Sequence, residues 1–290
     1  MIPGAFDYHR PDSLDEAIGL LARHGDQAKI LSGGMSLLPL LKLRLASVAH
    51  LVDIGRIPGL DYIKEEGGML KIGGATRQVA LERSEIVRSR YPILLDTVTL
   101  IADPLVRNRA TVAGNVANGD PANDHPASMI ALGATVVARG RSGERTIPIN
   151  QFYRGVFSTA LAPDEILTEI RIPTPPARSG GAYFKVKRKV GDYAAAAAAV
   201  QLTLGQGGEF ERAGIALTNA GPTPLEASEA QRYLLGKRAE EAVITQAARM
   251  AAAKASPSAD LRGSIEYKRD VARVLVARAL RRAVERAGGH

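Results

Sequence analysis

The sequence contains no cysteine among its 290 residues. It therefore cannot form a disulfide, hold zinc or an iron–sulfur cluster through thiolates, or use a cysteine nucleophile, and the absence fits a cytosolic protein. Histidine is also scarce, with five residues at positions 9, 24, 50, 125 and 290. They show neither an HExxH motif nor a paired spacing, which argues against a histidine-based metal site.

Long apolar runs are missing as well. The opening residues, MIPGAFDYHRPDS, lack the basic and apolar regions of a signal peptide, and no stretch reaches the roughly 18–20 apolar residues that span a bilayer. We therefore expect a soluble, cytoplasmic chain with no transmembrane segment.

Acidic residues are outnumbered, and the formal net charge is +8. Part of the excess lies in KRDVARVLVARALRRAVERAG, residues 268–288. Such a segment binds nucleic acid or a membrane in some proteins and is a solvated helix, or the contact for an acidic partner, in others. The segment has no aromatic residue and no nucleic-acid motif, so we expect no nucleic-acid partner.

Glycine and proline divide the chain into an α+β protein of two domains. The stretch PTPPARSGG (173–181) predicts the boundary between a domain at 1–175, with subdomains at about 1–55 and 56–175, and a second domain at 178–288. In the first domain, Ser13 and Glu16 predict the capped start of a short helix that ends near Gly25.

Further elements follow from local patterns. We expect strands at 28–31, 50–55 and 69–74, a helix at 76–95, a loop-rich stretch at 111–124, and a helix end followed by a strand at 129–140. The second domain reads as antiparallel strands joined by a hairpin at Gly207-Gly208, followed by helices from Thr223 onward. Six alanines at 194–199 favour a helix by propensity, but their alternating flanks favour an extended segment.

Two glycine loops are the candidates for chemistry. The first is Ser32-Gly33-Gly34-Met35-Ser36, after a buried strand, and the second is Thr111-Val112-Ala113-Gly114-Asn115. Consecutive backbone N–H groups at glycine can form a concave anion site, so two facing loops could hold a diphosphate. Ordinary tight turns are the alternative, and neither loop has the GxGxxG or GxxxxGK[ST] pattern, so a Rossmann fold or a P-loop is not supported.

Longer segments around these loops resemble a known family. SGGMSLLPLLKLRLA with HLVDIGRIPGL, and IADPLVRNRATVAGNVANGDPANDHPA, resemble the two FAD loops in medium subunits of the molybdenum hydroxylase (xanthine dehydrogenase) family. KRKVGDYAAAAAAVQL and IALTNAGPTPL resemble that family's C-terminal domain. The resemblance covers essentially the whole chain and is nearest to the aerobic carbon monoxide dehydrogenase type.

The resemblance implies a vanillyl-alcohol-oxidase-like (PCMH-type) FAD-binding domain followed by a smaller domain of antiparallel strands and helices. It implies noncovalent FAD here, and two partners: a large subunit with molybdopterin cytosine dinucleotide and a small subunit with [2Fe–2S] clusters. The flavin would pass electrons from those clusters to an external acceptor, a quinone in the carbon monoxide case. The complex would be a cytoplasmic heterotrimer, usually doubled to a heterohexamer, and its association with the inner face of the membrane stays open.

The resemblance also assigns residues by position. Ser32, Gly33, Gly34, Met35 and Ser36 with Thr111, Val112, Ala113, Gly114 and Asn115 would line the diphosphate. Asp124 would bond the sugar-alcohol chain, Leu167 and Lys185 would lie near the flavin ring, and Tyr193 would pack on it. Two positions depart from the family: Met35 stands where His or Gln is usual, and Ala113 replaces a common glycine, although backbone donors can survive both changes.

Three alternatives stay open at this point. The chain could be the medium subunit of another molybdenum hydroxylase, acting on a purine, an N-heterocycle or an aldehyde. It could be a stand-alone flavin oxidase, which would need its own acid or base, with His125 and Asp103 as candidates. It could be a basic nucleic-acid-binding module, whose binding would fall steeply with salt.

Overall fold

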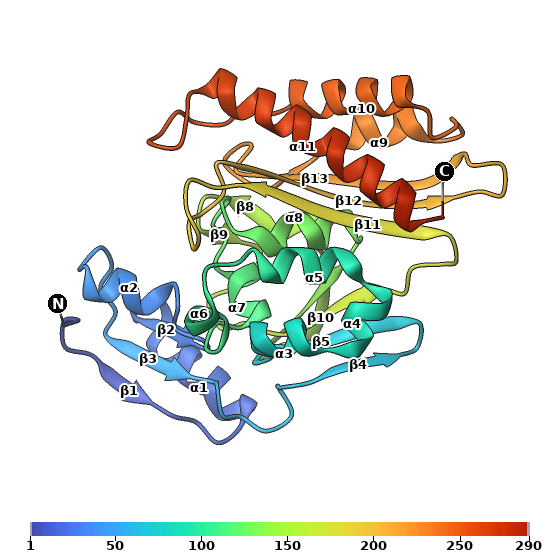
Figure 1. Ribbon diagram of the computed structural model, residues 1–290. Helices are drawn as coiled ribbons and strands as arrows, with labels where there is room; N and C mark the ends of the chain where they lie inside the picture. The colour runs from blue at the N-terminus through green and yellow to red at the C-terminus, as the bar shows by residue number, and fades with distance from the viewer. Residues whose placement is uncertain (1, 289–290) are drawn as a thin grey trace.

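The N-terminal segment folds around a three-stranded parallel sheet in the order β1-β3-β2. In the computed structural model, which describes residues 2–288, the strands are β1 (Asp7–His9), β2 (Ala28–Leu31) and β3 (His50–Asp53). Helix α1 (Leu14–His24) covers one face, where Val52 is buried, and α2 (Leu37–Lys42) covers the other, where Leu51 is buried (Figure 1). Alternate residues of β3 are therefore buried in two small hydrophobic cores, one beneath α1 and one beneath α2.

The predicted start and end of the first helix are confirmed. Ser13 Oγ accepts from the backbone N–H of Glu16 at 3.2 Å, and the Glu16 carboxylate accepts from the Asp12 N–H at 3.0 Å. The helix ends at Gly25, whose φ of +53° is costly for other residues, and the 3₁₀ turn η1 (Gly25–Gln27) leads into β2.

A five-stranded antiparallel sheet forms the centre of the molecule, in the order β4-β5-β10-β6-β7. Its strands are β4 (Ile63–Glu66), β5 (Met69–Gly73), β6 (Thr135–Gly140), β7 (Gly143–Pro148) and β10 (Ile166–Pro173). Six short helices accompany it: α3 (Gln78–Arg83), α4 (Glu85–Arg90), α5 (Pro92–Thr99), α6 (Pro104–Arg107), α7 (Val112–Ala117) and α8 (Asp124–Ala131). The turn η2 (Ile149–Gln151) and the hairpin of β8 (Tyr153–Gly155) and β9 (Ser158–Thr159) complete this part.

The single helix expected at 76–95 is wrong, because the structure has α3, α4 and the first half of α5 there. Ser84 breaks the first run: its backbone is extended, and its hydroxyl accepts from the Val87 N–H to begin a new helix. Pro92 breaks the second, because the residue before a proline is pushed out of the helical region, and Tyr91 has ψ of +58°. Proline then occupies the first turn of α5, which has no need of its N–H.

The loop expected at 111–124 is also partly wrong, since it contains α7. Thr111 caps this helix by accepting from the Gly114 N–H at 3.1 Å. Val112 and Val116, one turn apart, are fully buried in the central core. Their burial stabilises a helix that its glycine and asparagine content disfavours.

The C-terminal part is a four-stranded antiparallel sheet, β11-β12-β13-β14, with helices on both faces (Figure 1). The strands are β11 (Ser179–Val186), β12 (Ala196–Leu204), β13 (Phe210–Thr218) and β14 (Leu225–Glu226). Helices α9 (Ser228–Leu234), α10 (Glu241–Ala253) and α11 (Ile265–Arg286) lie on one face, and α5 and α8 on the other. The hairpin at Gly207-Gly208 joins β12 to β13, as predicted, and β14 interrupts the helical pattern expected from Thr223.

The alanine run is extended, as its flanks indicated. Ala196 and Ala198 belong to the core beneath α9–α11, whereas Ala197 and Ala199 belong to the core shared with α5 and α8. A strand that is buried on both faces lacks the alternation of apolar and polar residues by which strands are usually predicted from sequence. Small side chains let helices approach closely from both directions, and a Cβ on Gly180 would lie 1.9 Å from the carbonyl oxygen of Ala283 in α11.

These elements confirm the α+β class. No helix within residues 2–288 has the length and apolar character needed to cross a membrane.

Candidate functional site

The two glycine loops meet backbone to backbone. Gly33 lies so close to the second loop that an added Cβ would be 2.5 Å from the Arg109 carbonyl oxygen and 2.8 Å from the Thr111 nitrogen. The hydroxyls of Ser32 and Thr111 share a hydrogen bond of 3.1 Å. Only glycine, which has no Cβ, permits the two backbones to approach this closely, so the contact between the loops requires glycine at position 33.

The first loop leaves its backbone donors free. Gly34 has φ of +78°, which turns the chain between β2 and α2. The N–H groups of residues 33–36 donate to no acceptor among the described residues, and Ser36, which precedes α2, makes no side-chain cap bond to that helix. Successive free N–H groups beside a left-handed residue form an anion-binding concavity.

The second loop adds polar groups facing the first. A Cβ on Gly114 would lie 2.6 Å from Thr111 Oγ1, so glycine preserves the cap of α7. The side-chain oxygen of Asn115 is buried and has no hydrogen-bond partner within residues 2–288. Because a buried polar atom without a partner costs free energy, this oxygen fits a site whose ligand supplies a donor.

A cleft of about 840 Å³ opens beside the two loops. Its lining comes from the two loops, the β8–β9 hairpin, β10, β11 and the segment before β12. All but one of the residues assigned by the resemblance line this cleft. The residues that line it are Ser32, Gly33, Gly34, Met35, Ser36, Thr111, Ala113, Gly114, Asn115, Asp124, Leu167, Lys185 and Tyr193. Val112 is instead fully buried in the core, where it anchors α7.

A buried ion pair crosses the cleft's inner wall. Lys185 Nζ donates to the Asp124 carboxylate at 2.7 Å, and the Tyr183 hydroxyl donates to the other carboxylate oxygen at 2.5 Å. Burial raises the pKa of Asp124, and the two donors oppose that rise. Burial and the Asp124 charge raise the pKa of Tyr183 far above its ordinary value, which keeps the phenol a donor.

Tyr183 is the residue that sequence reasoning missed. It lies two positions before Lys185 on β11, so the two side chains share a face of the strand and both reach Asp124 at the start of α8. The alternation Tyr-Phe-Lys in a predicted strand was the available signal.

Tyr193 lies on the rim of the cleft and is 43% exposed. The preceding carboxylate holds its segment in place: Asp192 accepts from Arg188 at 3.0 Å, from Arg262 at 2.8 Å and from the Tyr193 backbone N–H at 2.9 Å. These donors lower the pKa of Asp192 well below its ordinary value. An aromatic ring that is half-exposed on a fixed backbone can contact a flat ligand.

Leu167 reaches the cleft at an irregularity of β10. The pairing of β10 with β6 shifts register between Leu167 and Glu169. Gly74 packs against this bulge so closely that a Cβ there would be 2.5 Å from the Leu167 carbonyl oxygen. A bulge of this kind redirects the backbone where the strand borders the cleft.

The two acid–base candidates do not line the cleft. His125 is fully buried and bonds to the Gln78 side chain at 2.8 Å, and Asp103 caps α6 by accepting from the Val106 N–H at 2.9 Å. Burial lowers the pKa of His125 to about 3, so it is a neutral structural residue at physiological pH.

The basic C-terminal segment forms α11, and several of its arginines are paired. Arg286 binds Asp96 at 2.5 Å, Arg273 binds Asp270 at 2.8 Å, and Arg281 contacts Glu241. The apolar side of the helix, including Leu275 and Leu280, is buried on the sheet. The ion pairs account for arginines of the segment, and the packing on the sheet accounts for its apolar residues.

Comparison with known protein families gives two matches. Residues 4–175 match the FAD binding domain in molybdopterin dehydrogenase, and residues 181–283 match the CO dehydrogenase flavoprotein C-terminal domain. The chain belongs to this flavoprotein family. It therefore carries the FAD-binding domain of a molybdenum-containing oxidoreductase, and the expected PCMH-type fold with its smaller C-terminal domain is confirmed.

Relatives within the flavoprotein family match over nearly the full length. The carbon monoxide dehydrogenase medium chain of Afipia carboxidovorans is 47% identical over 99% of both chains. A solved carbon monoxide dehydrogenase structure from Hydrogenophaga pseudoflava superposes with a TM-score of 0.96, at 47% identity and 99% coverage of both chains. Quinoline 2-oxidoreductase from Pseudomonas putida 86 is similar at a TM-score of 0.92, with 33% identity and 99% coverage of both chains.

Proposed function

We propose that this chain is the electron-transfer flavoprotein subunit of a complex that oxidises carbon monoxide. The observation that supports the substrate is the 47% identity to a carbon monoxide dehydrogenase medium chain over 99% of both chains. The quinoline enzyme has the same fold but only 33% identity. The fold alone would fit either substrate, so the proposal depends on the difference in identity.

In this proposal the FAD diphosphate lies between the two glycine loops. The free N–H groups of residues 33–36 are donors without acceptors, and a diphosphate is rich in acceptors. Ser32, Ser36 and Thr111 add hydroxyls at the same place. The unpartnered oxygen of Asn115 would accept from a cofactor hydroxyl.

The sugar-alcohol chain and the flavin ring would follow the cleft toward β11. Asp124 uses one bond to Tyr183 and one to Lys185, which leaves lone pairs on its carboxylate for a ribityl hydroxyl. Lys185 would add positive charge beside the ring, Leu167 an apolar wall, and Tyr193 an aromatic face. Val112 would act only indirectly, by holding α7 in the core.

FAD supplies redox chemistry that can exchange one or two electrons, so it can connect one-electron carriers to a two-electron acceptor. The chain's own residues would bind and orient the flavin and exclude water from its inner side. The sequence has no cysteine that could hold an iron–sulfur cluster. Electrons would therefore come from [2Fe–2S] clusters of a small partner subunit. A large subunit with molybdopterin cytosine dinucleotide would oxidise the substrate.

The external acceptor in this proposal is a quinone. A quinone resides in the membrane, so the complex would work in the cytoplasm at the inner face of the membrane and contact it through the assembled subunits.

The cofactor assignment is tested by releasing the flavin. Acid precipitation of the purified chain should leave a colourless pellet and a supernatant that contains FAD, because the chain has no cysteine and no histidine within residues 2–288 lines the cleft. A yellow pellet would disprove the noncovalent attachment. Release of FMN would disprove the diphosphate site.

The substrate is tested with the assembled complex. Carbon monoxide added without acceptor should bleach the flavin absorbance, whereas quinoline, a purine and an aldehyde should not. The isolated chain should stay oxidised with each of them. Bleaching by one of the other substrates but not by carbon monoxide would assign the chain to another molybdenum hydroxylase, and turnover by the isolated chain would favour a stand-alone oxidase.

A further inference from the structure

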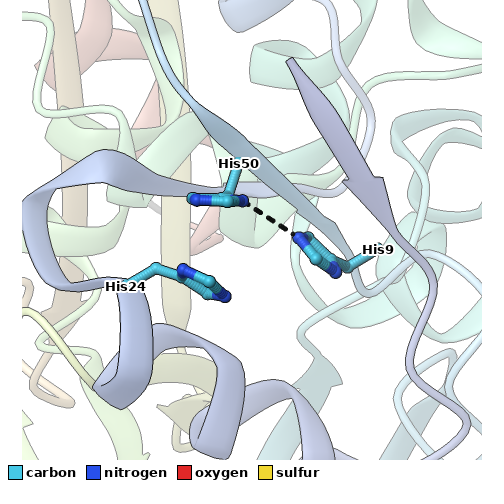
Figure 2. Close-up of side chains that lie close together, drawn as sticks. All are labelled: His9, His24 and His50. Carbon is cyan, nitrogen blue, oxygen red and sulfur yellow. Dashed lines mark hydrogen bonds between the residues drawn. The ribbon is translucent and has the colours of Figure 1, made fainter.

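Three of the five histidines converge in the N-terminal sheet, away from the cleft (Figure 2). His9 ends β1, His24 ends α1, and His50 begins β3. In the parallel pairing of β1 with β3, Asp7 lies opposite His50, so His9 is two residues further along the same face. That face is the one covered by α1, whose last residue is His24.

The ring nitrogens are near enough that side-chain rotation can bring all three onto one ion. One nitrogen from each ring lies within 4.8 Å of the other two, and His9 Nε2 is 3.1 Å from His50 Nδ1. Two imidazole nitrogens bound to one tetrahedral zinc ion at about 2.0–2.1 Å lie roughly 3.3 Å apart. The His9–His50 separation thus already has the value of a shared coordination shell.

Not all ring nitrogens of the three histidines are engaged in hydrogen bonds within the protein. His9 and His50 share one hydrogen bond, but neither ring nitrogen of His24 bonds to any residue in the described range. The His24 and His50 rings lie 3.7 Å apart between centroids, and all three residues are partly buried. Figure 2 shows the three rings gathered where β1, β3 and the end of α1 meet, with the His24 ring lying against the His50 ring and His9 beside them.

We propose that His9, His24 and His50 bind one divalent transition-metal ion, with Zn²⁺ as the preferred species. Imidazole is a ligand that suits zinc, copper and nickel, and a three-histidine shell leaves a fourth position open. The exposed Asp7 carboxylate, 3.5 Å from His50 Nδ1, or a water fills that position. None of the three histidines lines the cleft, so this site goes beyond the flavin function.

The role that follows is a crosslink. The ion joins β1, α1 and β3, which otherwise meet through a few backbone pairs, a small apolar core and the hydrogen bond from the Tyr8 hydroxyl to Asp53. The loop that follows β2 in the same sheet is the first glycine loop. Metal bound at the cluster would therefore stabilise the subdomain that carries half of the flavin site.

The test uses the full chain in a His290→Ala background, so that the cluster and the buried His125 are the only histidines left. The protein is treated with chelator, desalted and titrated with Co²⁺ and then with Zn²⁺. We expect one Co²⁺ per chain with the visible absorption bands of a four-coordinate site. Zn²⁺ should displace it stoichiometrically and raise the midpoint of thermal unfolding.

His24→Phe is the matched variant, because phenylalanine keeps a flat ring against His50 and removes both ligand nitrogens. It should retain FAD and the metal-free unfolding midpoint but lose stoichiometric Co²⁺ binding and the zinc-induced rise. His9→Gln, which keeps a polar side chain on the strand, should lose the same two signals. If the parent chain takes up no stoichiometric Co²⁺, or if His24→Phe binds it equally, the proposal is wrong, whatever the result for FAD.

Discussion

Asp124 and Lys185 form a buried ion pair of 2.7 Å that joins helix α8 to strand β11, across the two regions that match separate family domains. Both side chains are nearly inaccessible, at 7% and 1% exposed. A pair of this kind contributes little compared with an apolar contact, but leaving one charge alone is costly. The pair therefore fixes how the two halves of the cleft meet.

Lys185→Met should destabilise the fold by about 3–5 kcal/mol, because Asp124 would stay buried without its cation. Asp124→Asn combined with Lys185→Met should recover a large part of this loss, since the uncompensated charge is gone. Denaturant unfolding of the two single variants and the double variant measures the coupling. Losses that simply add would contradict an interaction between the two side chains.

Gly33→Ala should lower FAD occupancy, because its Cβ must push apart backbones that now lie 2.5 Å from that position. Gly33→Asp should lower it further than the equally sized Gly33→Asn, since repulsion from a diphosphate adds about 1–4 kcal/mol. Gly19→Ala is the control: it lies in α1 with nothing near its Cβ, and it should be neutral or stabilising. Flavin content per chain is the measurement. Equal content in the Gly33→Asp and Gly33→Asn variants would argue against a diphosphate beside this loop.

Tyr193→Ala should weaken FAD binding and slow reduction of the acceptor. Its half-exposed ring lines the cleft, and aromatic stacking contributes about 0.5–1.5 kcal/mol beyond area burial. Tyr193→Phe should change both much less, because stacking needs the ring rather than the hydroxyl. The readouts are the FAD dissociation constant and the flavin's visible spectrum. A spectrum and acceptor kinetics that stay the same in Tyr193→Ala would place the ring away from the cofactor.

His125 should make the protein less stable in acid. Its pKa is about 3 in the folded chain and ordinarily 6.5, so between these values the unfolded state binds a proton that the folded state does not. The unfolding free energy should therefore fall with decreasing pH, by at most about 1.4 kcal/mol per unit from this group. His125→Gln should reduce that slope between about pH 6 and pH 4 and leave the curve parallel to the parent's above about pH 8. An unchanged acid slope would show that His125 does not carry it.

Much of the site was predictable because its signals are local. A glycine pair after a buried strand and a threonine before an apolar turn each predict a backbone conformation within a few residues. The two loops line one cleft with their predicted residues, apart from Val112, which the core requires. Their roles toward FAD stay predictions.

Other features were missed because they depend on contacts between distant segments. Tyr183 reaches Asp124 only because the C-terminal sheet packs on α8. The break at Tyr91 is different: it is set locally by Pro92, and the prediction of one helix at 76–95 overlooked that proline. The three histidines show no motif spacing, yet they meet because β1 pairs with β3 beneath α1.

The sequence by itself determined the family, the α+β class, the cap of the first helix and the residue types that two close loops require, because each follows from local chemistry. Tertiary structure alone decided that Gly33 packs on residues 109–111, that Asp124 pairs with Lys185, and that His9, His24 and His50 share a space. The physical reason is that side-chain partners far apart in the chain are chosen by how sheets and helices pack, and a local pattern carries no record of that choice.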